Sequence, residues 1–503
     1  MLPQASLLSV LIWLPIFGGA ATLLFSKRPE TARWFALAIT VVTFLLSLQL
    51  YTDFDRAVAA MQFVQDSDWI RAYSIRYHLG VDGIAAALVL LTTAVSALVF
   101  VGAWRSVPGH VAQYHAAFLI LEGLLIGVFC AMDSILFYLF FEGMLIPMFI
   151  IIGVWGGPRR VYATMKFFLY TFLGSVFLLI SLIYLYLKGG SFQLADMYAL
   201  PLTATEQAWI FFAFFMAFAI KVPMFPVHTW LPDAHVEAPT GGSVILAAIM
   251  LKVGCYGFLR FSLPIVPDAS FEYAWVMIAF SLIAIVGIGM VAVVQTDMKK
   301  LVAYSSIAHM GLVTLGTFVA VVMMRESGND AGAQLGIQGA VVQMVSHGFI
   351  SGAMFSCVGV LYDRLHTRAI ADYGGVMNKM PWFGFFFVLF AMANCGLPGT
   401  SGFVGEFMVI LSVLQDNVWV AITAALSLII AAGFSLWLIK RILYGPVGND
   451  KVATMQDISG NEIWMLGAFA VAVLAIGIYP KPLTDLMQGS VAQLVNQILV
   501  VKL

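Results

Sequence analysis

The sequence predicts an all-α polytopic membrane protein of about 14 transmembrane helices, with two inverted five-helix repeats that each contain a discontinuous helix. Three observations predict this fold. The 503-residue chain is 62% hydrophobic and only 10% charged, and its mean hydropathy is +0.97. Apolar runs of spanning length follow one another along the whole chain. Prolines and glycines interrupt two of these runs close to a charged residue.

Composition excludes several classes of protein. A soluble fold cannot bury so much apolar surface with so few charges. The net charge of −1 argues against a nucleic-acid partner. The four cysteines lack the spacing of a metal or cluster site, so we interpret them as small core residues rather than ligands of an iron–sulfur cluster or c-type haem: Cys130, Cys255, Cys357 and Cys395.

Each predicted helix is an apolar run bounded by short polar or Gly/Pro turns. The first run has no basic residue before it and KRPE after it, the reverse of a cleavable signal peptide, so it is predicted to span with the N-terminus outside. The predicted spans are 5–25, 32–51, 80–104, 113–131, 134–153, 163–187, 207–224, 242–262, 272–292, 298–323, 337–361, 383–410, 418–443 and 461–479.

The chain is interpreted as one transmembrane domain, 1–503, without a soluble domain. The outside segment 52–79 and the stretch RESGNDAGAQ, 325–334, are expected to be loops. The tail 482–503 is weakly amphipathic and is predicted to lie at the membrane interface. Within the domain we distinguish N-terminal helices in 1–112, a first repeat in 113–262, a second, inverted repeat in 272–443, and a last helix with the tail in 461–503.

Two broken helices carry the evidence for the repeat. Pro223 and Pro226 interrupt one apolar run, and Pro398 with three glycines interrupts another, 175 residues after Pro223. Each unit would span an odd number of helices, so the second must be inserted upside down relative to the first. Inverted repeats with a broken helix in each half are the pattern of secondary transporters.

The positions of the basic residues support this count of helices. With the N-terminus outside, 15 basic residues, Arg105 among them, fall in inside loops and 8 fall outside. This bias follows the positive-inside rule. The two remaining basic residues, Lys221 and Lys252, are placed inside the membrane.

Ionisable groups inside a spanning helix cost about 2.5–3.5 kcal/mol each on insertion scales, so each one is a functional candidate. Glu142 lies within LFYLFFEGMLIPMFIII, and its alternative interpretation is a structural hydrogen-bond acceptor. Lys221 lies beside the first break, and its alternative is a lysine snorkelling to the interface. Lys252 lies about ten residues from either helix end, too deep to snorkel.

Further candidates lie in later helices. Glu406 follows the second break, and His309 and His347 occupy two neighbouring spans. A lone intramembrane histidine can be a satisfied core group, but two of them beside lysines and carboxylates favour a proton relay. Glu122 is also intramembrane, although no partner can be inferred for it. Asp82 and Asp133, at helix ends, are interpreted as capping or solvated residues: both lie just before apolar runs.

Four polar residues follow the first break on the inside face: His228, Asp233, His235 and Glu237. They form either a proton-collecting mouth or an ordinary solvated loop, and the sequence leaves both open. Glu142 and Lys221 have a chemistry of their own. A lysine in an apolar environment holds its proton only with help from a nearby carboxylate, so moving Glu142 away from Lys221 would release a proton to the next carrier.

At these positions the sequence resembles a known family. The stretches FYLFFEGMLIPMFIIIGVWGG, KVPMFPVHTWLPDAHVEAPTGGSVILAAIMLKVGCYGFLRF, QTDMKKLVAYSSIAHMG and GLPGTSGFVGEFMVI are similar to the M-type antiporter-like membrane subunit of proton-pumping NADH:quinone oxidoreductase, respiratory complex I, in the Mrp-antiporter-related superfamily. The resemblance covers nearly the whole chain. It implies fourteen helices and a proton path through Glu142, Lys221, Lys252, His309 and Glu406.

The resemblance also implies partners and a location. It implies no cofactor in this chain, with NADH, FMN, iron–sulfur clusters and quinone held by other subunits. It implies contacts with neighbouring antiporter-like subunits, the lipid bilayer and internal water, in a bacterial cytoplasmic membrane with the N-terminus on the periplasmic side. The alternatives are a subunit of a multisubunit cation/proton antiporter, a membrane enzyme with haem held by His309 and His347, and a structural spacer that moves no protons.

Overall fold

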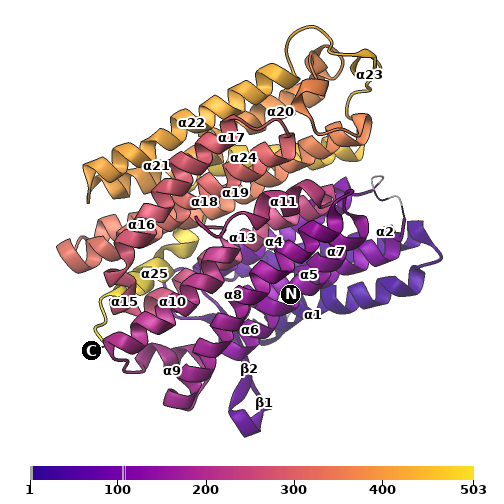
Figure 1. Cartoon of the computed structure of the whole chain (residues 1–503). Helices are drawn as coiled ribbons and strands as arrows, with labels where there is room; N and C mark the ends of the chain where they lie inside the picture. Colours follow the sequence, from indigo (N-terminus) through magenta and orange to yellow (C-terminus); the bar gives the residue numbers. More distant parts are fainter. Residues whose placement is uncertain (1–3, 105–106, 108, 503) are drawn as a thin grey trace.

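The structure is a computed structural model that describes residues 4–104, 107 and 109–502. Arg105, predicted in an inside loop, lies outside the described residues. Figure 1 shows long helices packed side by side in one bundle, with a β-hairpin projecting from one end. The strands are β1 (Gln62–Ile70) and β2 (Ile75–Val81), which pair antiparallel.

Helices α1 to α3 precede the hairpin in the chain, and the other helices follow it. Several spans are divided by short π-helical turns or by single residues, so the number of elements exceeds the number of spans. The helices are α1 (Gln4–Thr22), α2 (Pro29–Ser47), α3 (Gln49–Thr52), α4 (Gly83–Gly102), α5 (Val111–Cys130), α6 (Ser134–Gly143), α7 (Leu145–Trp155), α8 (Arg160–Gly189), α9 (Leu194–Ala199), α10 (Ala204–Lys221), α11 (Trp230–Glu237), α12 (Thr240–Ile245), α13 (Leu251–Gly257), α14 (Leu263–Ile265), α15 (Pro267–Glu272), α16 (Ala274–Leu282), α17 (Gly289–Val293), α18 (Met298–Val322), α19 (Asp330–Leu365), α20 (Pro381–Asn394), α21 (Ser401–Leu414), α22 (Val418–Ile442), α23 (Asp450–Ala453), α24 (Asn461–Ile478) and α25 (Lys481–Ile498).

The predicted membrane fold is confirmed. In the described part of the chain, 12 helices are long and apolar enough to cross a bilayer. The two remaining predicted spans are the two broken helices. The first is α10, which ends at Lys221 and is followed after a non-helical stretch by the short α11. The second is α20 and α21, separated by residues 395–400.

Three spans form the interior of the bundle. They are Thr240–Ile265, Met298–Ser327 and Asp330–Leu365, and between 94% and 100% of their apolar windows is buried, against 28–78% for the others. A helix that is buried on all sides contacts protein rather than lipid around its whole circumference. These three spans carry Lys252, His309 and His347, so the structure places all three residues at the centre of the protein.

Local sequence explains where the helices begin and end. Asp82 and Asp133 cap α4 and α6 through their carboxylates, which accept backbone N–H bonds, as the capping interpretation predicted. Thr203 and Glu206 form a capping box at the start of α10. Pro147 cannot donate to the carbonyl four residues earlier, and the helix is interrupted near that position, between α6 and α7.

Two predicted loops contain regular structure. The segment 52–79 holds most of the hairpin, whose second strand continues to Val81. The segment 325–334 is mostly helical, because Asn329 caps α19 and the helix already begins at Asp330. The four cysteines are buried and free, as interpreted from their spacing.

We name the two ends of the bundle by their contents. The hairpin face holds β1 and β2, α9, α15 and the C-terminal helix α25, which packs against α4 and α19. The opposite face holds the turns at 26–28, 156–159, 222–229 and 294–297. The amphipathic tail is thus helical and covers protein with its apolar side; its predicted place at a membrane interface stays a prediction.

Candidate functional site

Lys252 lies at the centre of the candidate site and is fully buried. It follows a π-helical turn, Leu246–Met250, in which the wider ladder leaves backbone carbonyls turned toward side chains. The Lys252 Nζ donates to one of these, the Ala247 carbonyl, at 2.7 Å, and lies 2.7 Å from the Nδ1 of His347. Two polar partners therefore hold the ammonium group where water has no direct access.

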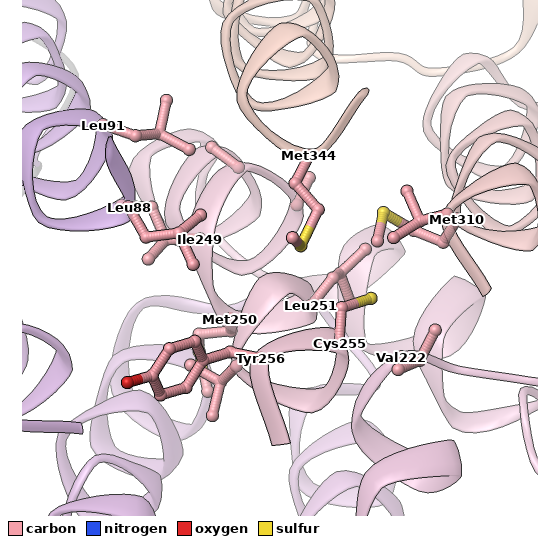
Figure 2. Close-up of a cluster of buried hydrophobic side chains, with 14 of the residues drawn as sticks. Leu88, Leu91, Val222, Ile249, Met250, Leu251, Cys255, Tyr256, Met310 and Met344 are labelled. Carbon is pink, nitrogen blue, oxygen red and sulfur yellow. The ribbon is translucent and has the colours of Figure 1, made fainter. Parts of the chain in front are cut away.

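Apolar side chains surround the helix that carries this lysine. Figure 2 shows Leu88, Ile249, Met310 and Met344 around the helix that carries it, on both sides of the chain segment Met250–Tyr256. All of these side chains belong to one buried cluster. In such a low-dielectric environment a charge is stabilised only by the few polar groups it contacts, so its interactions with His347 and the backbone are strong.

From Lys252 a line of polar side chains continues to the second broken helix. The rings of His347 (α19) and His309 (α18) lie 5.7 Å apart between centroids. The His309 Nδ1 lies 2.8 Å from Glu406 Oε1 in α21. All three side chains are at least 96% buried. Lys252, His347, His309 and Glu406 thus form a row across four helices, α13, α19, α18 and α21.

The second break lies at the end of this row. Gly396 has a φ of +75°, which lets the chain turn out of α20, and a Cβ there would lie 3.2 Å from Glu406 Oε2. Pro398, two residues later, cannot continue a helix. Gln343 donates to Glu406 Oε1 at 3.3 Å. The predicted break is therefore present, and it faces the carboxylate.

Lys221 occupies the last position of α10, at the first break. It is only 2% exposed, and its Nζ lies 4.8 Å from the centroid of the Phe141 ring. The snorkelling alternative is therefore wrong. Pro223 has no N–H for the Ala219 carbonyl, so the Met224 N–H donates there at 2.7 Å, and Trp230 Nε1 donates to the Ile220 carbonyl at 2.8 Å.

Glu142 lies near the C-terminal end of α6, and its carboxylate is the charged group that acts on Lys221. The two groups interact electrostatically, and the Ser175 hydroxyl of α8 is within hydrogen-bonding reach of the carboxyl. No ion pair joins Glu142 to Lys221 among the described residues, so they are not in direct contact in this conformation. The switch between these two groups stays a prediction.

Close helix packing brings the two lysines onto neighbouring elements. Gly254 of α13 lies against α10, and a Cβ at this position would meet the Phe218 carbonyl oxygen at 2.7 Å and the Val222 nitrogen at 2.8 Å. Only glycine allows two backbones to approach this closely. The helix of Lys221 and the helix of Lys252 are therefore in direct contact.

The predicted mouth on the opposite face is only partly formed as expected. Asp233 pairs with Lys166 at 2.7 Å and is partly exposed, and His228 is 9% exposed. Glu237 is buried and accepts from the Arg159 backbone at 2.9 Å. His235 is fully buried and stacks on Phe355 at 4.4 Å, so the mouth interpretation is wrong for it.

His235 instead lies within electrostatic range of Lys252 and His347. The sequence showed it only as a polar residue after a broken helix, and nothing in that pattern indicated burial. Glu122 lies apart from this row, in α5, where it accepts from Thr40 at 3.1 Å. This contact supplies the partner that the sequence could not.

The row and the nearby groups Glu142, Lys221 and His235 carry several buried polar atoms that have no hydrogen-bond partner among the described residues. In a native protein such atoms are satisfied by internal water or serve in proton transfer. No group of three or more His, Cys, Asp or Glu able to hold a metal is found in the described part of the chain. The unpartnered atoms are Glu142 Oε2, Lys221 Nζ, His235 Nδ1 and Nε2, His309 Nε2, His347 Nε2 and Glu406 Oε2.

Comparison with known proteins places this arrangement in context. A family model described as "NADH:quinone oxidoreductase/Mrp antiporter, TM" matches residues 131–431. NADH-quinone oxidoreductase subunit M of Rhodobacter capsulatus is 48% identical over 509 residues, covering 98% of this chain and 96% of the relative.

Two solved structures are similar over nearly the whole chain. A chain of respiratory complex I from Thermus thermophilus with bound NADH superposes with a TM-score of 0.88 at 27% identity, covering 98% of this chain and 99% of the other. A chain of the Mrp complex from Dietzia sp. DQ12-45-1b superposes with a TM-score of 0.80 at 22% identity, covering 96% and 52%, which indicates a shared fold.

Proposed function

Because the chain belongs to the NADH:quinone oxidoreductase/Mrp antiporter transmembrane family, as an M-type antiporter-like membrane subunit of complex I, we propose that it moves protons through the buried polar row while quinone is reduced elsewhere in the complex. The observation that carries the proposal is the row of close groups, in which Lys252 lies 2.7 Å from His347, the His347 and His309 rings lie 5.7 Å apart, and His309 lies 2.8 Å from Glu406. The first and last steps join a group that can give a proton to one that can take it, and the step between the two histidines passes through internal water.

Proton movement along the row follows from these contacts. The Lys252 ammonium faces the Nδ1 of His347, so this nitrogen accepts and the Nε2 on the far side of the same ring releases a proton. The unpartnered Nε2 of His309 receives it through internal water, and its Nδ1 passes a proton to Glu406. Glu406 then holds it beside the second break, where the chain opens.

Glu142 and Lys221 control proton transfer along this row. Lys221 has no hydrogen-bond partner in the described residues, so its proton is held mainly by the field of Glu142. A shift of α6 toward or away from Lys221 would change how tightly that proton is bound. Conformational change driven by quinone reduction thus becomes proton transfer without a redox group in this chain.

We further propose the orientation and surroundings that the sequence predicts. The hairpin face is the periplasmic side and the opposite face the cytoplasmic side of a bacterial inner membrane, since the basic loop residues concentrate on the opposite face. Asp233, Lys166 and His228 form the cytoplasmic entrance. NADH, FMN, iron–sulfur clusters and quinone belong to partner subunits, with neighbouring antiporter-like subunits in contact with this chain.

A cation/proton antiporter subunit is the second candidate, because the fold is shared with a chain of an Mrp complex. Inverted membrane vesicles distinguish the two. NADH-driven acidification that depends on Lys252 supports the complex I assignment. Sodium/proton exchange that proceeds equally without NADH would support the antiporter instead.

The direct test is a Lys252→Met variant of the assembled complex. Methionine keeps the length of the side chain but cannot carry a proton. We expect NADH oxidation to remain measurable while the proton gradient per NADH falls by about half or more. Lys440→Met, at the exposed end of α22, is the matched control and should pump normally. An unchanged gradient in an assembled Lys252→Met complex would show that the chain is a structural spacer.

A further inference from the structure

The helix that carries Lys252 also has a stripe of polar residues, Lys252, Tyr256 and Arg260, which runs toward the hairpin face. Lys252, Tyr256 and Arg260 stand four residues apart, so they lie one above the other on the same side of the helix. Figure 2 shows the Tyr256 ring inside the apolar cluster, with its hydroxyl pointing away from Met310 and Met344. The stripe thus extends from the turn that carries the central lysine toward the hairpin face.

Arg260 ends the stripe and is held by contacts on several sides. Its guanidinium pairs with Asp82 at 2.6 Å and its Nε donates to the Tyr256 hydroxyl at 3.1 Å. Its carbonyl accepts from Tyr198 at 2.9 Å, and the Tyr256 hydroxyl donates to the Phe129 carbonyl at 3.0 Å. Arg260 lies within a π-helical turn, Phe258–Ser262, and both partners of the ion pair are largely buried.

A cavity of about 290 Å³ lies on the hairpin side of this ion pair. Met61 before the hairpin, Asp82, Tyr256, Arg260, and Ser490 and Gln493 of α25 are among its lining residues. The Ser490 hydroxyl also accepts from the Gly83 backbone at 2.8 Å, which fixes α25 over the start of α4. A polar cavity of this volume can hold several waters.

The two ends of the stripe differ in how their polar atoms are satisfied. Three atoms of the central row have no partner in the described residues, His309 Nε2, His347 Nε2 and Glu406 Oε2. At the hairpin end, both Asp82 carboxylate oxygens, the Tyr256 hydroxyl and the Arg260 Nε each have a partner. A group whose donors and acceptors are all engaged has no free position for an incoming proton or water. The polar groups at the hairpin end of the stripe are therefore held in place by hydrogen bonds, whereas the central row has free positions.

We propose that Arg260, fixed by Asp82 and Tyr256, is a non-titratable cation that seals the Lys252 row from the cavity at the hairpin face. The inference rests on the proposed function. Arginine retains its proton at physiological pH, whereas lysine exchanges it. The ion pair with Asp82 also fixes the guanidinium at the wall of the cavity. Arg260 is a positioning and sealing residue that transfers no proton itself.

The decisive variant is Arg260→Lys in the full complex. It keeps the positive charge and the pairing with Asp82 but extends the titratable stripe to the cavity. Inverted vesicles carrying the variant are given an imposed pH gradient without NADH, and a pH-sensitive dye follows its collapse. We expect collapse to be about twofold faster or more. Adding Lys252→Met to the variant should restore the slow rate, because the leak runs through that lysine.

A neutral pair gives an independent second test. Asp82→Asn with Arg260→Gln removes both charges together and leaves no unpaired buried ion, and asparagine caps α4 as well as aspartate does. This variant should also leak. Glu206→Gln is the matched control, because it removes the Lys188–Glu206 ion pair at the same face while glutamine preserves the capping box.

The outcomes separate the seal from the proposed function. Tight vesicles with assembled Arg260→Lys and with the assembled neutral pair would overturn the seal, even if Lys252→Met loses pumping. Normal pumping in Lys252→Met would overturn the proposed function whatever the leak. Failure of both seal variants to assemble, with Glu206→Gln assembled, would also overturn the seal, because a purely structural ion pair would then explain these residues.

Discussion

His347 is the residue that joins the two halves of the buried row. Its Nδ1 faces Lys252 and its ring lies beside His309, so replacing it interrupts transfer while leaving both neighbours in place. We predict that His347→Gln lowers the NADH-driven gradient by about half or more, because glutamine accepts hydrogen bonds but does not shuttle protons. Dye quenching in vesicles, normalised to NADH oxidation, measures this effect.

The control for this prediction lies at the end of the same helix. His366 caps α19 with a φ of +56°, a conformation that asparagine tolerates. His366→Asn should therefore pump like the unchanged protein. Equal losses in His347→Gln and His366→Asn would indicate a general disturbance of α19 rather than a broken relay.

Lys221 tests whether a charge alone is sufficient at the first break. Lys221→Arg keeps a cation opposite Glu142 but cannot release its proton. We predict that the variant assembles yet pumps no better than Lys221→Ala, measured as protons moved per NADH. Pumping close to normal in Lys221→Arg would mean that this position supplies only a fixed field.

At the level of single residues, sequence identified the buried groups but not their contacts. Lys252 and Glu406 could be predicted because a charge inside an apolar run is costly enough to indicate function. His235 could not, since it follows a broken helix where burial depends on Phe355 from a distant span. The partner of Glu122 likewise depends on the packing of α2 against α5, and neither segment alone contains a sequence pattern that predicts this contact.

Between whole helices, the contact of α10 with α13 depends on Gly254. We predict that Gly254→Ala lowers the free energy of unfolding or assembly by about 1–3 kcal/mol, because the new methyl group meets backbone atoms that cannot move aside. The amount of assembled complex and its thermal midpoint in detergent measure this cost.

The matched control is Gly467 in α24, where nothing lies within 4 Å of a built Cβ. Gly467→Ala should leave assembly unchanged or increase it slightly, since alanine stabilises a helix by about 1 kcal/mol relative to glycine. If Gly254→Ala assembles as well as Gly467→Ala, the close approach of the two helices is not required.

The helices themselves were largely predictable, whereas their irregularities were not. Apolar length and terminal caps determine where α4 or α18 lies, and both signals are local. The π-helical turn before Lys252 has no signature in LAAIM, because it results from how the surrounding helices pack. The hairpin was not predicted, because its strands, within 62–81, lie mostly in a polar segment between two apolar runs, and such a segment is typical of a loop.

For the whole molecule, the decisive question is whether both broken helices serve one path. Glu142 lies near the first break and Glu406 near the second, with the two lysines and two histidines between them. We predict that Glu142→Gln and Glu406→Gln each lower the number of protons moved per NADH, and that the double variant is no worse than the more severe single variant. Removing two members of one serial path costs no more than removing either.

Two independent paths would give a different result. The two single losses would then add, and the double variant would lose the sum of both. Vesicles with matched amounts of assembled complex distinguish these outcomes in one experiment. Because the three spans between the breaks are the most buried in the described chain and lie in mutual contact, a single serial path is the arrangement that this bundle supports.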